Sequence, residues 1–349
     1  TPSLTNPNLT WEKSTTKNLG FDFTFLNNRL TFAADIYERK VTDILIPGGK
    51  DYPALIGDDD LPFENAGILK TTGFELQAKW SDRLANGFSY SLGVALSDDK
   101  AKVISYPSNP TNKIGDGVLY KGYTVGDIWG YVTGGILQEG DFDGVGANGK
   151  PLYHGPYFKG GQAYPGYVWY QDLDHDGVIT TGLNTVNDPG DRKVIGNNAP
   201  RYRYNVTANF QYKGFDLDLM FQGVGKRDYW LSSSSSYWGN GAGSWETYND
   251  SWTPERTDAK FPMYGSGVGS YAQTGYLLDA SYIKLKQVIL GYTFPKSWIG
   301  KIGLEKLKLN VAAYNLFTIS DVPKYYDADY LSDAYPPKRT FSVGIQVGF

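Results

Sequence analysis

The most specific chemical motif in the chain is a run of aspartates in QDLDHDGVIT. Asp172, Asp174 and Asp176 alternate and Gly177 follows them, which matches the first half of an EF-hand loop. Alternate carboxylates on a turning loop converge on one hard cation, and Ile179 is expected to anchor the loop by packing inward. The motif predicts a structural calcium ion that stiffens residues 105–200, and no other cofactor is expected.

The second half of the motif departs from this pattern. Its twelfth position is Leu183 and not the bidentate glutamate, so closure of the site requires Asp188, Asp191, a backbone carbonyl or water. No helical pattern flanks the loop. A turn rich in Asp and Gly that only punctuates an exposed loop therefore stays as the alternative interpretation.

Aromatic side chains outside the strand-like segments form the second group with a chemical use. Sugars and peptides bind across flat rings with polar rims, and Trp and Tyr supply such area at little entropic cost. The alternative is that these rings pack the loops against one another or against a partner. The candidate ligand-binding residues are Trp129, Tyr131, Trp169, Tyr170, Tyr237, Trp238, Trp245 and Trp252.

Residues for catalysis are scarce. The chain has no cysteine, its only histidines are His154 and His175, and no nucleophile elbow or paired metal-binding histidine motif appears. Carboxylates such as Asp22, Asp35 and Glu75 fall on polar rows of strand-like segments, where a solvated wall explains them. We therefore expect no enzyme activity.

The net charge of −4 also argues against nucleic acid as a partner.

The elements that must position these residues are strands. The 28 Tyr, 17 Phe and 42 Gly are typical of a β-rich protein, and no apolar stretch reaches the roughly 18 residues of a membrane helix. Strict period-two alternation indicates a sheet whose faces meet different environments. It occurs in nine segments, 18–25, 30–46, 73–80, 88–97, 202–212, 215–222, 282–294, 307–313 and 341–349. The seventh changes parity, so a bulge is expected near Lys286 or Gln287.

The connections between these segments alternate in length. Short connections fall at 27–28, 81–87, 213–214 and 295–306, and long ones without strand pattern at about 47–70, 105–200, 224–280 and 318–338. Tight periplasmic turns and large outer loops are typical of an outer-membrane β-barrel, whereas compact soluble domains rarely contain several long structureless loops. A soluble sandwich is the alternative. Interfacial aromatic girdles are expected at segment ends; the candidates are Trp80, Tyr90, Tyr202, Tyr212 and Tyr292.

Nine strands are too few, and odd in number, for closure. Bacterial barrels have even strand numbers, and an open edge in lipid leaves backbone groups unsatisfied at several kcal/mol each. We therefore expect residues 1–349 to form the C-terminal part of one transmembrane barrel domain and to pair along two open edges with an upstream part. Phe349 ends the last alternating segment and is expected to act as an assembly signal; simple lipid-facing packing is the alternative.

Nearly the whole chain resembles one family. The resemblance is carried by LTWEKSTTKNLGFDFTFLNNRLTFAADIYERKVTDIL at 9–45, NAGILKTTGFELQAKW at 65–80, PRYRYNVTANFQYKGFDLDLMFQG at 200–223, SYIKLKQVILGYTFP at 281–295 and RTFSVGIQVGF at 339–349. Together these segments resemble the SusC-like TonB-dependent outer-membrane transporters.

The resemblance implies a barrel of about 22 strands closed around an N-terminal plug. The plug, the TonB-contacting box and the first half of the barrel are not among these residues. The resemblance also implies TonB-dependent import of a bulky nutrient, an oligosaccharide or a peptide, across the Gram-negative outer membrane. A SusD-like lipoprotein is the implied lid, which the long connections would contact. The alternatives are a passive outer-membrane pore or surface adhesin, and a soluble glycan-binding β protein.

Overall fold

The computed structural model describes residues 6–48, 62–115, 117–230, 245–266, 271–324, 326–331 and 337–349. Its long elements are all strands, and its helices are single turns of three to five residues. None of the helices in these ranges is long and apolar enough to cross a membrane.

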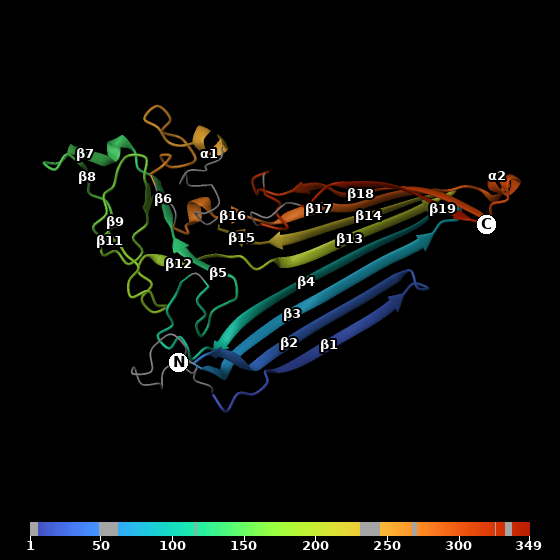
Figure 1. Cartoon of the computed structure of the whole chain (residues 1–349), viewed down its shortest axis with the longest axis horizontal. Coiled ribbons are helices and arrows are strands. Elements are labelled where there is room, and N and C mark those ends of the chain that lie inside the picture. Colours follow the sequence, from blue (N-terminus) through green and yellow to red (C-terminus); the bar gives the residue numbers. More distant parts are fainter. Residues whose placement is uncertain are drawn as a thin grey trace.

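One antiparallel sheet dominates the structure (Figure 1). Its nine strands pair in chain order, with only the short elements of the long connections left out of the series. The strands are β1 (Lys13–Phe25), β2 (Leu30–Pro47), β3 (Phe63–Arg83), β4 (Ser89–Ser105), β13 (Arg201–Tyr212), β14 (Phe215–Lys226), β17 (Tyr282–Thr293), β18 (Lys306–Ile319) and β19 (Thr340–Gly348). All nine predicted segments are therefore confirmed as strands.

The two faces of the sheet differ because side chains alternate along each strand. The register aligns Asp35 with Glu75, Glu75 with Ser97 and Ser97 with Arg203, which places a polar row on one face, called the luminal face below. The other face carries the apolar rows, and these side chains are exposed from one edge of the sheet to the other, as at Phe23, Val94, Leu290 and Val343. An exposed apolar face of this extent is the surface that a barrel wall presents to lipid.

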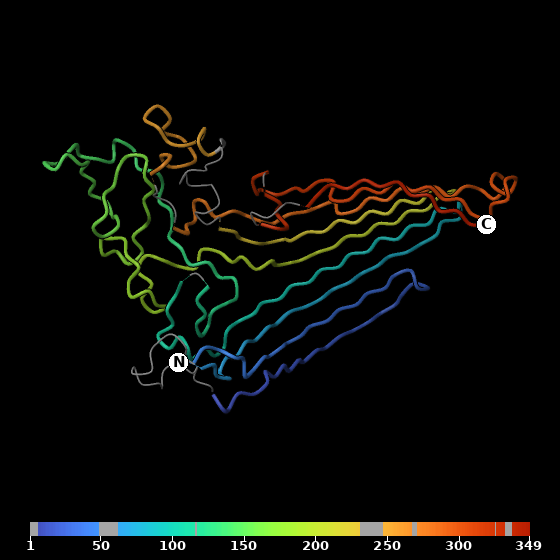
Figure 2. Tube along the Cα trace, in the orientation of Figure 1, coloured from blue at the N-terminus to red at the C-terminus, as the bar shows by residue number. Residues whose placement is uncertain are grey.

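The sheet is open. β1 and β19 lie at its opposite edges and do not pair with each other in the described part of the chain, as predicted (Figure 2). What pairs with these two edges stays a prediction.

Tight turns connect the strands at one end of the sheet, called the turn end. Asn27 and Asn28 have φ of 56° and 67°, and Lys213 and Gly214 have φ of 46° and 89°. Left-handed backbone at both central residues matches the twist of the flanking strands, and Asn and Gly adopt it at low cost. The C-terminus lies at the same end (Figure 1).

Aromatic residues of the apolar face gather at the turn end. Trp80 donates its indole N–H to the Tyr90 hydroxyl at 3.1 Å, and the rings of Phe215 and Tyr292 lie 4.5 Å apart. Tyr212 packs edge-on against Phe88. Four of the five girdle candidates therefore lie together at one end of the strands, and Tyr202 lies at the other end of β13.

The predicted bulge is confirmed at Lys286. β14 pairs Met220 with Gln287 and Phe221 with Leu285, so Lys286 is an extra residue in β17. The extra residue keeps Leu285 and Val288 on the apolar face, although their numbers differ in parity.

Residues 105–200 form a folded unit and not a structureless loop, so that expectation is wrong. It contains the short elements β5 (Asp127–Tyr131), β6 (Thr133–Ile136), η2 (Glu139–Asp141), β7 (Phe142–Val145), β8 (Pro151–Tyr153), β9 (Tyr157–Phe158), β10 (Val168–Tyr170), β11 (Val178–Ile179) and β12 (Arg192–Asn197). These strands pair as two-stranded ribbons, with β12 on β5, β10 on β6, β8 on β7 and β11 on β9. Most are too short for a period to show in the sequence.

The described part of the next long connection joins this unit. It contains β15 (Asp228–Tyr229), α1 (Trp245–Asn249), η3 (Thr274–Tyr276) and β16 (Leu278–Asp279). Phe261 and Tyr276 share a buried core with Tyr131, Tyr170 and Ile179, and the Tyr131 amide donates to the Ala272 carbonyl at 2.9 Å. We call the described residues of 106–200 and 245–280 the outer domain; it stands beyond the strands at the end opposite the turns, the loop end (Figure 1). Two more short helices, α2 (Lys296–Ile299) and η4 (Gly300–Ile302), lie at the turn end.

Candidate functional site

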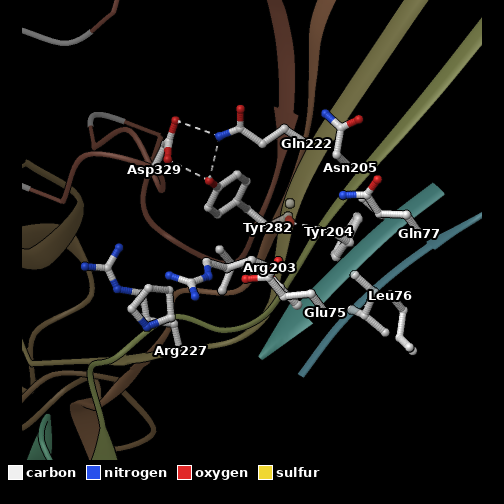
Figure 3. A pocket seen from close by; sticks show the side chains of 16 residues that line it. Glu75, Leu76, Gln77, Arg203, Tyr204, Asn205, Gln222, Arg227, Tyr282 and Asp329 are labelled. Atoms are coloured by element: carbon white, nitrogen blue, oxygen red, sulfur yellow. Dashed lines mark hydrogen bonds between the residues drawn. The ribbon is translucent and has the colours of Figure 1, made fainter. Parts of the chain in front are cut away.

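A hollow of about 650 Å³ lies against the luminal face at the loop end (Figure 3). Its floor is the small residues Ala95 and Ser97 of β4, and longer polar side chains of β3 and β13 rise on either side. The lining residues used below are Glu75, Gln77, Ala95, Ser97, Arg203, Asn205, Gln222, Tyr282 and Asp329. The hollow therefore follows directly from the residue sizes in adjacent luminal rows.

One wall of the hollow comes from the chain that follows β18. Lys284, which is 1% exposed, donates to both carboxylate oxygens of Asp327 at 2.8 and 3.0 Å. The Tyr282 hydroxyl donates to Asp329 at 2.6 Å, and the Gln222 amide donates to the same carboxylate at 3.4 Å. These bonds fix the segment 326–331 to β14 and β17.

Apolar contacts support the same attachment. Val322, Ala328 and Leu331 form a buried cluster with Val224 and Tyr282. The side chains of Lys284 and Asp327 are 1% and 17% exposed, so an unpaired charge on Lys284 would be costly.

The outer ends of β4 and β13 are tied by two ion pairs. The Arg201 guanidinium donates to both oxygens of Asp98, and that of Arg203 donates to Asp99. Arg203 also lines the hollow (Figure 3). The side chains of Glu75, Gln77 and Asn205 make no hydrogen bond or ion pair with any residue that the structure describes, although their backbones pair in the sheet.

The aspartate motif lies in the outer domain between β10 and β11. One carboxylate oxygen from each of Asp172, Asp174 and Asp176 lies within 4.8 Å of the others. His175 and Gly177 have φ of 63° and 84°, and these left-handed residues turn the loop so that the three carboxylates converge. Ile179 is buried in the aromatic core, which confirms the expected anchor.

A fourth aspartate, Asp191, joins the two ends of the loop. Asp191 is fully buried, and its oxygens accept the amide N–H groups of Leu173 at 2.8 Å and Thr180 at 2.7 Å. Leu183, at the twelfth position, is exposed. Asp191 therefore ties the two ends of the loop together and is not one of the three converging carboxylates.

Charge is concentrated at this loop. Desolvation and then the nearby carboxylates of Asp191 and Asp176 raise the pKa of Asp174 above its ordinary value. Asp172 behaves in the opposite way: although desolvation opposes ionisation, the amides of Gly177 and His175 that donate to it hold its pKa below the ordinary value. A cation among these oxygens would relieve the repulsion that Asp174 feels.

The aromatic ligand-binding candidates lie in different environments. Tyr170 is 2% exposed, and burial raises its pKa far above the ordinary value; Trp252 is 3% exposed and donates its indole N–H to Gln138. Trp129 is half-buried and donates to the Tyr120 hydroxyl, and the Trp169 ring covers Gly134.

The remaining candidates give less structural detail. Tyr131 lies in the core of the outer domain. Tyr237 and Trp238 lie outside the described residues, and Trp245 begins α1 with its side chain outside the described set. A ligand-binding role for any of these residues stays a prediction.

The sequence analysis missed Lys284, Asp327 and Asp329. Lys284 stands on the luminal parity of its strand, and its partner is 43 positions away in a long connection. The alternating carboxylates of Asp327 and Asp329 beside tyrosines were the one available signal, but spacing alone does not name a partner.

The sheet, its apolar outer face and its polar hollow define a wall of an outer-membrane β-barrel. The family described as TonB dependent receptor-like, beta-barrel matches residues 1–316, and the chain belongs to this family. The protein is thus an outer-membrane β-barrel protein. In such proteins the tight turns face the periplasm and the long loops face outward.

Individual relatives agree with this assignment. A TonB-dependent receptor of Formosa agariphila is 29% identical over 99% of the chain and 35% of its own length. The TonB-dependent receptor SusC of Bacteroides thetaiotaomicron is 28% identical over the whole chain and 33% of its own length. The chain therefore spans about a third of the length of these relatives.

The fold is also similar to solved structures. The RagAB peptide importer in its open-open state superposes with a TM-score of 0.73 at 22% identity, over 99% of this chain and 35% of that one. A second structure of the RagAB peptide transporter gives a TM-score of 0.71 at 21% identity, over 99% and 36%. At these identities the similarity supports the fold alone.

The attachment of segment 326–331 can be tested at Lys284. Lys284→Met leaves Asp327 without its cation and should weaken the attachment by roughly 3 kcal/mol. Exposed Lys324 precedes this segment, so trypsin should cut there faster in the variant than in the unaltered protein in lipid. Lys286→Met, in the same strand but with its nitrogen 4.0 Å from Asp329, is the matched control. Equal cleavage of the two variants would contradict a special role for the buried pair.

Proposed function

We propose that the protein is part of a TonB-dependent transporter that imports a bulky nutrient, a glycan or a peptide, across the outer membrane beneath a SusD-like lipoprotein lid. The observation that carries the proposal is the family match over most of the chain, on a wall whose luminal face has a polar hollow below a folded outer domain. The edges of β1 and β19 pair, in this proposal, with further strands of the same barrel around a plug.

Peptide and glycan cargo have different support. A peptide is a candidate because RagAB, which has a similar fold, is a peptide transporter, but the shared fold by itself does not select the cargo. The half-buried rings of Trp129 and Trp169 in the outer domain favour a ligand with flat apolar faces, as sugars have. We propose no catalytic step, since the relatives are TonB-dependent receptors. A passive pore is the second candidate function, because a polar luminal face by itself suits either.

Energy coupling separates these two functions. Cells that carry the full-length transporter should take up a glycan or peptide mixture, and removal of TonB should abolish that uptake. Co-purification of a surface lipoprotein with the transporter would support the lid. Uptake that continues unchanged without TonB would contradict the proposal and favour a passive pore.

Phe349 is proposed as an assembly signal. It follows β19 at the turn end and is 88% exposed, so little of its ring is used in packing within the chain. Phe349→Ala should lower the amount of transporter in the outer membrane, measured in isolated membranes. Val347→Ala removes a smaller lipid-facing side chain of the same strand and is the control. An equal loss in both variants would indicate simple packing against lipid.

Calcium is proposed as a structural ion at Asp172, Asp174 and Asp176. The residues fit: oxygens that bind one calcium at 2.3–2.6 Å lie at most about 5 Å apart, and the three carboxylates meet this condition. Three carboxylates are fewer than the usual ligands, so water would complete the shell. The ion would hold the turn that leads into buried Ile179 and would thereby stiffen the outer domain.

Titration calorimetry tests the calcium site. The purified transporter should bind calcium, and Asp174→Asn with Asp176→Asn should remove the binding while sparing Asp172, which accepts two backbone amides. Asp143→Asn, an exposed carboxylate of the same outer domain paired with His154, is the control. Absence of binding at millimolar calcium would leave a plain turn as the better account.

A further inference from the structure

We infer that the luminal hollow over β4 binds the main chain of an extended peptide. The inference rests on the proposed import function and narrows its cargo to peptides. It is carried by three features of the hollow, which are its shape, its unpaired polar groups and the state of its aromatic rings.

The shape suits one extended chain. Neighbouring strands lie about 4.8 Å apart, so side chains of β3 and β13 in one row rise from backbones separated by roughly 9 to 10 Å. Between them, β4 offers only Ala95 and Ser97. A second hollow of about 350 Å³ adjoins the first past Gly93 and shares Gln77, Ala95 and Asn205 with it, while its far side reaches β1 and β2. We call the part of the two hollows that lies over β4, between the side chains of β3 and β13, the groove.

The unpaired groups match a peptide backbone. Gln77 and Asn205 stand in one row on either side of Ala95, and neither side chain has a hydrogen-bond partner among the described residues. Each primary amide donates and accepts, as each peptide unit of a cargo does. Two such groups across a groove can therefore bind successive peptide units whatever the cargo's side chains are.

The charges of the groove are of both signs. In the next row, Glu75 and Arg203 stand on either side of Ser97. Glu75 has no cationic partner among the described residues, whereas Arg203 is paired with Asp99. An amino group of a peptide, from its terminus or a lysine, supplies the missing cation for Glu75, which a neutral oligosaccharide does not.

The two aromatic rings that line the first hollow are covered by other residues of the chain. The Tyr204 ring lies on Gly223, and its hydroxyl donates to the Tyr282 carbonyl at 3.2 Å. Tyr282 is 5% exposed, and the Lys284 ammonium lies 5.8 Å from its ring centre. Neither ring offers the open flat face on which a sugar stacks, so the hollow favours peptides over glycans.

Binding to the purified full-length transporter tests this inference. The probes are a tryptic digest of casein and a mixture of maltooligosaccharides, with retained molecules measured by mass spectrometry. The digest should bind, and Gln77→Ala with Asn205→Ala should weaken it about tenfold, as expected for the loss of two hydrogen bonds. Gln346→Ala removes an exposed amide from β19 on the same face, away from the groove, and should leave binding unchanged.

A second arm isolates Glu75. Glu75→Gln should weaken the binding of peptides with free amino groups and not of the same peptides after acetylation. Two results would overturn the inference. One is that the unaltered transporter retains oligosaccharides and the double variant does not. The other is that all variants bind the peptides equally well. The variants could also lose peptide binding while uptake proves independent of TonB. That combination would support peptide binding in the groove and would contradict the proposed function.

Discussion

A backbone N–H or C=O group that faces lipid must find its partner within the protein, and the rest of this structure depends on that constraint. The nine-stranded ladder meets it between neighbouring strands, apart from local bulges, and leaves one edge each of β1 and β19 open in the described part of the chain. Because a strand alternates its side chains, the same ladder separates an apolar from a polar surface. The polar luminal face, which carries the small residues of β4 and the unpaired amides beside them, therefore follows from the way in which the wall pairs its own backbone.

At the loop end, water is available and the constraint relaxes. The outer domain contains only short two-stranded ribbons, and buried polar side chains form hydrogen bonds with backbone groups that no ladder pairs. The Asn109 side chain bonds three backbone groups, of Lys113 and Leu119, and Asp191 accepts two amides across its loop. Gln273 is fully buried and donates to the Tyr170 hydroxyl in the core. Irregular chain is thus held in one conformation by side chains that are each specific to their place.

This difference explains what could be predicted from the sequence. The wall was predictable, because two environments impose a period of two on ten or more residues, and even the bulge at Lys286 left a change of parity. The outer domain was not, because strands of two to six residues are too short to show a period and the bonds of Asp191 and Gln273 join distant positions. The convergence of Asp172, Asp174 and Asp176 was visible in their spacing, whereas the pairing of Lys284 with Asp327 depends on how a long connection folds back.

The bulge at Lys286 also divides β17 into two halves with different structural requirements. The half toward the turns must keep its alternation in step with the lipid, while the half toward the outer domain carries Tyr282 and Lys284, which hold segment 326–331. The extra residue shifts the alternation of side chains by one position between the two halves. The outer half can therefore direct Tyr282 and Lys284 toward segment 326–331 while Val288 and Leu290 stay on the apolar face that meets the bilayer.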